Sequence, residues 1–462
     1  MVFADVKQRR GLLGSVVCAL VLWVPFSVQA ATYYVSPQEN DAWSGTSQSQ
    51  PWRTIGRVNQ QNLNPGDQVL FQAKQTFSGS LYLAPEDTGT LASPVVIGSY
   101  GDGRALISSG TKKGLFAYNV NGLTVRDLNF VGSGSTVSTE AGVSIYTDAA
   151  EGREGVKIYS IDVSKYGKNG IEIGGWNSTH AYRHVRVSFS DTHHNRNNGL
   201  IIYGQVPYAN EDVYVEYVDA YYNSGIPGQS GNSGSGIVLG NVRQGTVEFS
   251  KAYENGWLCD APEGPAGIWT YDSTEVVIQS NQSFRNRTGG PADGDGYDLD
   301  RNVSYSTLQY NESYENEGAG YLMAHSPNNA NHTGNLVRNN TSRDDGRKNS
   351  YGGIVLWGRI RNATVQDNDV TVSPASSGKP AAVVVANWSI PWNCVENVLF
   401  TSNTFETSSG ARLVNVTPDQ VQCASGLSFE GNAYYATGPF RILWGSKEYS
   451  SVKAWHSATG QE

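Results

Sequence analysis

Short strings in which apolar and other residues alternate after a glycine recur through the middle of the chain. Six of them are Gly199-Leu-Ile-Ile, Gly236-Ile-Val-Leu, Gly267-Ile-Trp-Thr, Gly296-Tyr-Asp-Leu, Gly320-Tyr-Leu-Met and Gly353-Ile-Val-Leu. Alternation with a period of two is typical of a β-strand, whereas an amphipathic helix repeats every 3.6 residues. The pattern therefore predicts a series of short strands with no helical body.

A polar residue precedes each of these strands at nearly constant intervals. The positions are Asn195, Asn223, Asn255, Asn286, Asn316 and Asp344, at spacings of 28, 32, 31, 30 and 28 residues. Self-similarity at such a period indicates stacked units, and a unit of short strands and Gly/Asn turns is one coil of a parallel β-helix. We expect the asparagines to stack at one turn of every coil, because a short amide tolerates left-handed backbone and bonds its neighbours above and below.

The chain is expected to begin with an export signal. Lys7, Arg9 and Arg10 precede an apolar run over residues 12–24, and the small residues near Ala30 suit signal peptidase. We therefore predict a signal peptide at residues 1–30 and a secreted or periplasmic protein. No other stretch of the sequence is apolar enough to span a bilayer.

The rest of the sequence divides into three predicted segments. Residues 31–122 form an N-terminal cap with the first coils, and the string Pro51-Trp-Arg-Thr-Ile-Gly-Arg-Val is expected to be a short closing helix. Residues 123–430 form the regular parallel β-helix, and residues 431–462 form a C-terminal capping segment. Solenoids need such caps because their end coils would otherwise expose the core.

Composition narrows the class of partner. Charged residues make up only 16% of the chain, the net charge is −9, and there are 26 tyrosines and 11 tryptophans. An acidic balance argues against nucleic acid, which needs a basic face. Aromatic side chains beside carboxylates are typical of sugar binding, so we expect a polysaccharide or oligosaccharide partner. The sequence leaves the oligomeric state open.

Three cysteines follow the predicted signal peptide. Cys394 and Cys423 are 29 residues apart, about one coil, so they are expected on neighbouring rungs where a disulfide can form. Cys259 is left over, and we interpret it as a buried packing residue.

The chain resembles a known superfamily. The opening Ala31-Thr-Tyr-Tyr-Val-Ser, the asparagine-laddered coils and the ending from Gly431-Asn-Ala-Tyr-Tyr to Trp455-His-Ser-Ala-Thr-Gly are similar to secreted bacterial proteins of the pectate-lyase-like superfamily. The resemblance covers nearly all of the mature chain and implies an all-β, right-handed parallel β-helix. It does not fix an activity, because the superfamily includes lyases, glycoside hydrolases, epimerases and non-catalytic adhesins.

One coil differs from the others in its chemistry. The string Ala292-Asp-Gly-Asp-Gly-Tyr-Asp-Leu-Asp-Arg301 has four aspartates in eight residues. Strand alternation turns the second and fourth residues after each glycine outward, which places Asp298 and Asp300 on the outer face. The same rule puts Trp269 and Tyr271 on the outer face one coil earlier and Trp357 two coils later. Aspartate is a poor strand former and like charges repel, so a functional role is favoured over a solvated Asp-Gly turn.

Two reaction types fit this coil. The Cα atoms of Asp298 and Asp300 are expected about 6.5–7 Å apart, which suits a general acid and base that flank a glycosidic bond. Alternatively, Asp293, Asp295 and Asp298 could hold Ca²⁺ for β-elimination on a uronate glycan, the only cofactor that the sequence suggests. Asp295 is also a candidate catalytic group.

The lyase hypothesis meets an obstacle in the family-nine pectate lyases. The strings Ala292-Asp-Gly and Asp344-Asp-Gly look like fragments of the calcium-binding segments of that family. The strand that resembles its lysine-bearing strand is Gly353-Ile-Val-Leu-Trp-Gly, which has no lysine. We therefore favour hydrolysis, with a calcium-dependent lyase as the alternative and a non-catalytic glycan-binding surface or matrix protein as a second alternative.

Several other side chains are candidates near this coil. Arg301 and Lys348 could act as a base or clamp the substrate, and His325 could carry a proton. The remaining substrate-binding candidates are Asp260 and Glu263, in an insertion that could wall the groove, and Asp272, which could close the site from below. No zinc site is predicted, because His193 and His194 lack further ligands at suitable spacing.

Overall fold

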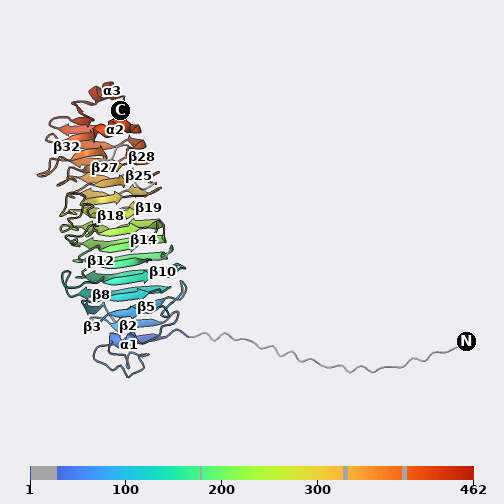
Figure 1. The fold of residues 1–462 in the computed structure, drawn as a ribbon. Helices are drawn as coiled ribbons and strands as arrows, with labels where there is room; N and C mark the ends of the chain where they lie inside the picture. Colours follow the sequence, from blue (N-terminus) through green and yellow to red (C-terminus); the bar gives the residue numbers. More distant parts are fainter. Residues whose placement is uncertain (2–28, 177–178, 326–330, 388–392) are drawn as a thin grey trace.

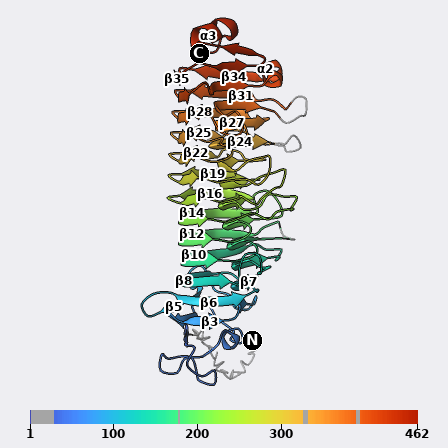
Figure 2. The ribbon, with the colours of Figure 1, turned by 90° about the vertical axis from the view of Figure 1, so that its left-hand side faces the viewer.

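The computed structural model describes Met1 and residues 29–176, 179–325, 331–387 and 393–462 (Figure 1). Nearly all of the predicted signal peptide at residues 1–30 lies outside the described residues. The described chain rises coil by coil along one axis from the N-terminal cap to the C-terminal end (Figure 2). Within it, no helix combines the length and the apolar character needed to cross a membrane.

The coils build two long sheets. The smaller sheet contains β4 (Leu81–Leu83), β7 (Leu115–Tyr118), β9 (Val143–Thr147), β11 (Ile171–Gly175), β13 (Leu200–Tyr203), β15 (Ile237–Gly240), β18 (Ala266–Tyr271), β21 (Asp295–Leu299), β24 (Tyr321–His325), β27 (Gly352–Gly358), β30 (Ala381–Ala386), β33 (Arg412–Val416), β36 (Ile442–Trp444) and β37 (Lys447–Tyr449). Its strands pair in parallel, except that β36 and β37 are antiparallel.

The larger sheet covers the other sides of each coil. Its strands are β1 (Thr32–Val35), β2 (Gln68–Gln72), β3 (Thr76–Ser78), β5 (Val95–Tyr100), β6 (Ala105–Gly110), β8 (Leu123–Gly132), β10 (Arg153–Ser164), β12 (Tyr182–His193), β14 (Asn210–Tyr221), β16 (Val242–Glu248), β17 (Lys251–Tyr253), β19 (Thr274–Gln279), β20 (Gln282–Phe284), β22 (Thr307–Gln309), β23 (Glu312–Tyr314), β25 (Leu336–Arg338), β26 (Thr341–Arg343), β28 (Arg361–Gln366), β29 (Asp369–Val372), β31 (Glu396–Thr401), β32 (Thr404–Ser408), β34 (Ser425–Glu430) and β35 (Ala433–Thr437).

Helices are confined to short pieces near the two ends. They are α1 (Ile55–Val58), which falls within the predicted closing helix, α2 (Pro418–Cys423) and α3 (Val452–Thr459). The prediction of an all-β, right-handed parallel β-helix with an N-terminal cap is confirmed.

The core runs up the axis between the sheets. The first and third residues after each strand glycine enter it, as alternation predicts: Tyr297 and Leu299 of β21 are fully buried, and so is Ile268 of β18. The side chains that alternate with them point outward, so the outer face of the smaller sheet can carry functional groups.

A ladder of asparagines joins the coils, as predicted. The side-chain Nδ2 of each of Asn195, Asn223, Asn255 and Asn286 donates to the Oδ1 of the next ladder asparagine at 3.2, 3.0, 3.0 and 3.0 Å. Each acceptor Oδ1 also takes the backbone N–H of the residue below. Because these amides are buried, an unpaired member would leave its neighbours without partners.

Two details of the ladder prediction were wrong. The acidic member is Asp345 rather than Asp344. Ser313 pairs with Ser342, so the residue that stacks on Asn316 is Asp345, one position later than predicted. Left-handed backbone falls on the residue before each ladder position, such as His194 with φ 55° and Asp344 with φ 52°. The ladder side chain thus bonds its neighbours from an ordinary backbone conformation.

A second ladder was missed in the sequence. Asn281, Asn311, Asn340, Asn368, Asn403 and Asn432 bond one another in order at 3.1, 3.1, 3.0, 2.9 and 2.8 Å between Nδ2 and Oδ1. Its intervals of 30, 29, 28, 35 and 29 residues are visible in the sequence. These asparagines are not followed directly by a glycine-led strand, so the strand pattern alone does not assign them to the repeating coil.

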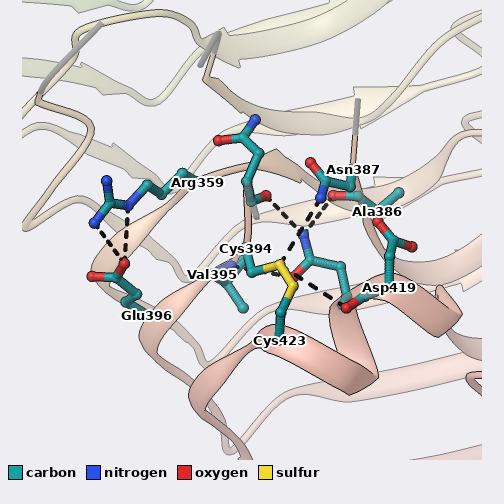
Figure 3. Close-up of a disulfide and its surroundings, with 10 residues drawn as sticks. Arg359, Ala386, Asn387, Cys394, Val395, Glu396, Asp419 and Cys423 are labelled. Carbon is teal, nitrogen blue, oxygen red and sulfur yellow. Dashed lines mark hydrogen bonds and ion pairs between the residues drawn. A yellow bond between two sulfur atoms is a disulfide. The ribbon is translucent and has the colours of Figure 1, made fainter. Parts of the chain in front are cut away.

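A disulfide joins Cys394 to Cys423, with 5.9 Å between their Cα atoms (Figure 3). It connects the end of α2 to the segment before β31, as the 29-residue spacing predicted. Cys259 is buried and has a free thiol, as expected of a packing residue.

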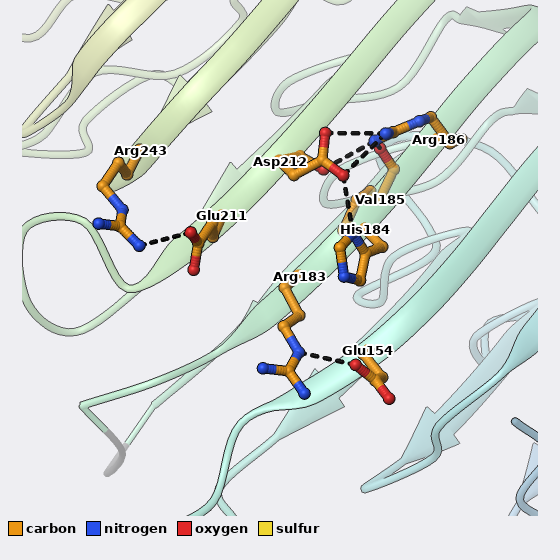
Figure 4. A network of polar contacts seen from close by, with 8 residues as sticks. All are labelled: Glu154, Arg183, His184, Val185, Arg186, Glu211, Asp212 and Arg243. Carbon is orange, nitrogen blue, oxygen red and sulfur yellow. Dashed lines mark hydrogen bonds and ion pairs between the residues drawn. The ribbon is translucent and has the colours of Figure 1, made fainter. Parts of the chain in front are cut away.

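The outer face of the larger sheet carries charge pairs between successive coils (Figure 4). Arg183 lies 2.7 Å from Glu154, and Asp212 accepts from both His184 at 2.7 Å and Arg186 at 2.8 Å. Such exposed pairs contribute little stability each, and every carboxylate here already has a cation. This face therefore resembles an ordinary solvated surface.

We predict that Asn286→Leu lowers the free energy of unfolding by roughly 1–3 kcal/mol, because Asn286 is 1% exposed and its loss leaves buried partners unsatisfied. Chemical denaturation followed by circular dichroism measures the change. Asn62→Leu, at an exposed position outside both ladders, is the matched control. An equal effect of the two substitutions would contradict the role of the ladder.

Candidate active site

A cavity of about 570 Å³ opens on the outer face of the smaller sheet. Its floor is made by outward side chains of β13, β18, β21, β24 and β27. These side chains are Ile201, Trp269, Tyr271, Asp298, Leu322, Ala324 and Trp357. The strand register places Trp269 beside Asp298 and Asp298 beside Leu322. The cavity is therefore a direct product of coil stacking.

Loops that precede the strands form its wall. Glu263 comes from the loop before β18, Asp293 from the loop before β21, and Asn349 and Tyr351 from the loop before β27. Because all these loops enter their strands at the same end, their side chains meet on one edge of the cavity.

Asp298 is the most deeply placed outward carboxyl group. It is 7% exposed, and its Oδ1 has no hydrogen-bond partner among the described residues. Burial raises the pKa of Asp298 well above its usual value, and the neighbouring carboxyl groups raise it further. Asp298 therefore carries a proton that it can donate to a ligand in the cavity.

Asp300 lies at the end of the same strand and in the same cavity. Burial raises the pKa of its carboxyl group to about 7, and the charge of Asp293 acts in the same direction. Near neutral pH, Asp300 can therefore give up or take a proton. This property distinguishes it from Asp298 and allows the two groups to take different roles.

Asp293 ties the loop wall together. Its Oδ2 accepts from Gly264 N at 2.7 Å, and its Oδ1 accepts from the Tyr351 hydroxyl at 3.1 Å. Its backbone oxygen accepts from Asn349 Nδ2 at 3.3 Å. Burial raises the pKa of Asp293 to about 6. The residue thus joins loops of three coils.

Asp295, the first residue of β21, lines the cavity and is fully buried. Its Oδ1 accepts the backbone N–H of Ala319, and an added Cβ at Gly318 would lie 2.2 Å from that oxygen. Burial, followed by the charge of Asp293, raises the pKa of Asp295 well above its usual value. Its other oxygen has no partner among the described residues.

Arg301 is the one cationic side chain among the described residues that line the cavity. Its Nη2 lies 3.4 Å from Asp272, and its guanidinium lies 5.3 Å from the centre of the Tyr271 ring. Five carboxyl groups line the same cavity: Glu263, Asp293, Asp295, Asp298 and Asp300. The site is therefore strongly acidic, and its single cation is already shared with Asp272.

The structure brings most of the predicted site residues together but places some elsewhere. Asp260 accepts the backbone N–H of Gly228 at 2.6 Å and is outside the cavity lining. Lys348 donates to the backbone oxygen of Thr288 and lies 3.7 Å from Glu317. Asp272 reaches the site only through its ion pair with Arg301. All three residues lie outside the cavity lining, and their roles stay predictions.

His325 does not line the cavity. It is 3% exposed on β24, and its ring centre lies 5.9 Å from that of His332. Alternation places it on the inward side with Tyr321 and Met323. The hypothesis that His325 carries a proton for the outward carboxyl groups is therefore not supported by its position.

Tyr351 and Asn349 are site residues that the sequence reasoning missed. Both lie in the loop before β27, just as Asp293 lies in the loop before β21. Aligning residues upstream of each glycine-led strand, rather than only the strand residues, would have revealed them. The pair also positions Trp357, whose ring stacks on Tyr351 at 5.6 Å between centres.

Among the described residues, no group of three or more histidine, cysteine, aspartate or glutamate side chains is arranged to hold a metal ion. Asp293 uses both carboxylate oxygens on partners within the protein, and Asp295 uses one. The arrangement of Asp293, Asp295 and Asp298 therefore gives the calcium hypothesis no support.

Comparisons with known proteins place this geometry in context. No protein-family model matches the chain. A lacto-N-biosidase of Bifidobacterium longum subsp. longum is 23% identical over an alignment of 401 residues. The match covers 63% of this chain and 25% of that protein. The chain thus spans about a quarter of the length of this curated relative.

Solved structures share the fold. The crystal structure of a GH136 lacto-N-biosidase from Eubacterium ramulus is 17% identical, with a TM-score of 0.62, and the match covers 88% of this chain and 68% of the other. A pectate lyase structure is 18% identical, with a TM-score of 0.44, over 74% of this chain and 80% of the other. The match to the Eubacterium ramulus structure shows that the chain shares its fold, and the stacked parallel strands of the chain agree with the β-helix that the resemblance implied.

The acidic cluster should make stability depend on pH. The folded chain keeps protons on Asp293 and Asp300 up to a pH of about 6 and about 7, whereas the ordinary aspartate pKa is 3.8. Between these limits the folded state binds more protons than the unfolded state, so the free energy of unfolding falls as pH rises from about 4 to about 7. We expect Asp300→Asn to weaken this fall in melting-temperature measurements across that range. An unchanged slope would contradict the raised pKa, and Asp369→Asn on exposed β29 is the control.

Proposed function

We propose that the cavity is the active site of a glycoside hydrolase that binds and cleaves an extracellular oligosaccharide or polysaccharide. The observation that carries the proposal is the pair Asp298 and Asp300, which project from one strand end into an aromatic-lined cavity with different proton affinities. Two carboxyl groups with separate roles are the machinery of glycosidic bond hydrolysis.

The two groups divide the reaction between them. Asp298, which keeps its proton, donates it to the glycosidic oxygen as that bond breaks. Asp300, once ionised, removes a proton from a water molecule whose oxygen attacks the anomeric carbon. We assign the inverting arrangement, in which the attacking water lies between Asp300 and the sugar.

Aromatic side chains supply the binding surface. The rings of Trp269 and Tyr271 lie 5.1 Å apart between centres on one side of the aspartates, and Trp357 lies on the other. Pyranose faces are rich in C–H groups and stack on such rings, while carboxylates accept hydroxyl hydrogens. The scissile bond would then lie between two aromatic contacts.

The charge of the cavity favours a neutral glycan over a uronate. Those of the five carboxyl groups that are ionised repel a uronate carboxylate, and the one cation among the described lining residues is already paired with Asp272. Among the described residues, the β-elimination alternative therefore has neither an arranged calcium site nor a free counter-charge. The similarity to lacto-N-biosidases supports hydrolysis and makes lacto-N-biosyl saccharides the first substrates to test.

We also propose that the protein is exported. The proposal rests on the charged and apolar pattern of residues 1–30 and is supported by the Cys394–Cys423 disulfide, since such bonds persist in oxidising compartments. An extracellular or periplasmic location would give the cavity access to glycans outside the cell.

The reaction type is tested with a glycan panel. The purified protein is incubated with the 4-nitrophenyl glycoside of lacto-N-biose, neutral polysaccharides, alginate and pectate, with and without a chelator. We expect new reducing ends from a neutral substrate, no unsaturated ultraviolet chromophore, and no loss of activity on chelation. Formation of the chromophore with loss of activity on chelation would establish the lyase instead. Binding without turnover on any substrate would indicate a glycan-binding protein.

We predict that Asp298→Asn and Asp300→Asn each reduce kcat by about two orders of magnitude or more, because each removes one proton-transfer group. Initial rates on the active substrate measure the loss, and circular dichroism checks that the variants fold. Binding through Trp269 and Trp357 should survive, as measured by calorimetry. Asp369→Asn on the larger sheet is the control, and full activity of both site variants would move the active site away from this coil.

A further inference from the structure

A second recess, of about 460 Å³, lies on the same outer face nearer the N-terminal end. Its lining comes from β4, β7 and the segments that enter β4, β7 and β9: Ser80, Tyr82, Thr111, Lys112, Lys113, Phe116, Thr139 and Glu140. None of these residues lines the acidic cavity. The recess is thus a separate hollow on the sheet that carries the aspartates.

Aromatic rings form its base and continue beyond it. Tyr82 lies 5.9 Å from Phe116 between ring centres, Phe116 lies 6.1 Å from Tyr118, and Tyr118 lies 6.2 Å from Tyr146. Tyr82 is 40% exposed, and Trp176, just past β11, is 51% exposed. A row of partly exposed rings along a strand face is a surface on which successive sugar rings can stack.

A fixed polar rim accompanies these rings. The Lys113 Nζ lies 2.9 Å from Glu140 and 3.7 Å from Glu172, and it lies 5.5 Å from the centre of the Phe116 ring. Burial opposes ionisation of Glu140, but the pairing with Lys113 holds its pKa below the usual value. The rim therefore presents both donors and acceptors to hydroxyl groups: Lys113 and Glu140 are paired with each other, and Lys112 adds a second ammonium group.

The strand register connects this recess to the acidic cavity. Phe116 pairs with Ser144, Ser144 with Glu172, and Glu172 with Ile201, which lines the cavity. The recess is three strand spacings, or about 14 Å, from the edge of the cavity, and six strand spacings, or about 29 Å, from Asp298. Both hollows thus lie on one line of outward positions, at a separation that an oligosaccharide can bridge.

We propose that this recess is a second carbohydrate-binding site, which holds neutral sugar units of the same glycan chain whose linkage is cleaved at Asp298 and Asp300. The proposal rests on the proposed hydrolase function and extends it, because it makes the protein selective for long or multivalent glycans over short ones. Tyr82 and Phe116 supply the stacking surface, and Lys113 with Glu140 orients the hydroxyl groups.

Kinetics provide the first test. The double variant Tyr82→Ala/Phe116→Ala is compared with the unaltered protein on the short 4-nitrophenyl glycoside of lacto-N-biose and on mucin glycans. We expect KM on mucin to rise by about two- to tenfold for each ring removed, with kcat and the short-substrate rate unchanged. Tyr435→Ala, at a 58% exposed tyrosine on β35 of the other sheet, should change neither. Equal effects on both substrates, or none on mucin, would overturn the proposal.

Binding without catalysis provides the second test. The Asp300→Asn protein, with or without the recess substitutions, is run in native gels that contain mucin, arabinogalactan or β-glucan. If the Asp300→Asn protein is retarded in the gel and adding Tyr82→Ala abolishes that retardation, the recess is supported as a binding site. This result does not require hydrolysis of any substrate, so a failure of the hydrolase proposal can be told apart from a failure of the second site. Retardation that persists in the recess variants, or that occurs in no gel, would overturn the second site while leaving the hydrolase proposal to its own experiment.

Discussion

Stacking of buried side-chain amides between coils is the constraint on which the rest of this structure depends. The Oδ1 of each ladder asparagine accepts from both the backbone N–H and the side-chain Nδ2 of the asparagine one coil earlier, so a coil can add to the stack only in one register. A neutral hydrogen bond contributes about 1 kcal/mol net, but a buried partner left unpaired costs more. The ladder therefore acts mainly by excluding other registers.

The register in turn determines the chemistry of the outer face. Because β18, β21 and β24 stack in register, Trp269, Asp298 and Leu322 become neighbours although they are far apart in the chain. A shift of one residue would turn Asp298 into the apolar core, where a carboxyl group is costly. The acidic cluster opposes folding through burial and repulsion, and the regular coils on both sides hold it in place.

One continuous face carries both hollows. Loops that enter the strands at one end deepen the face into the acidic cavity near β21 and leave a shallower aromatic recess near β7. Asp293 shows how the wall is fixed, because its carboxyl group bonds the loop of the preceding coil and the loop two coils later. A solenoid can therefore change its substrate range by altering loops while its coils stay the same.

The sequence by itself determined the parallel coils, the inward and outward alternation, and the acidic coil with Trp269 and Tyr271 beside Asp298 and Asp300. These features follow from a period of two within each strand and a repeat of nearly constant length, both of which are local properties of the chain. The tertiary structure alone decided that Asp345 rather than Asp344 continues the ladder and that Tyr351 reaches Asp293 across 58 residues. Those outcomes depend on strand register and loop closure between coils, and such long-range pairing has no signature in a single stretch of sequence.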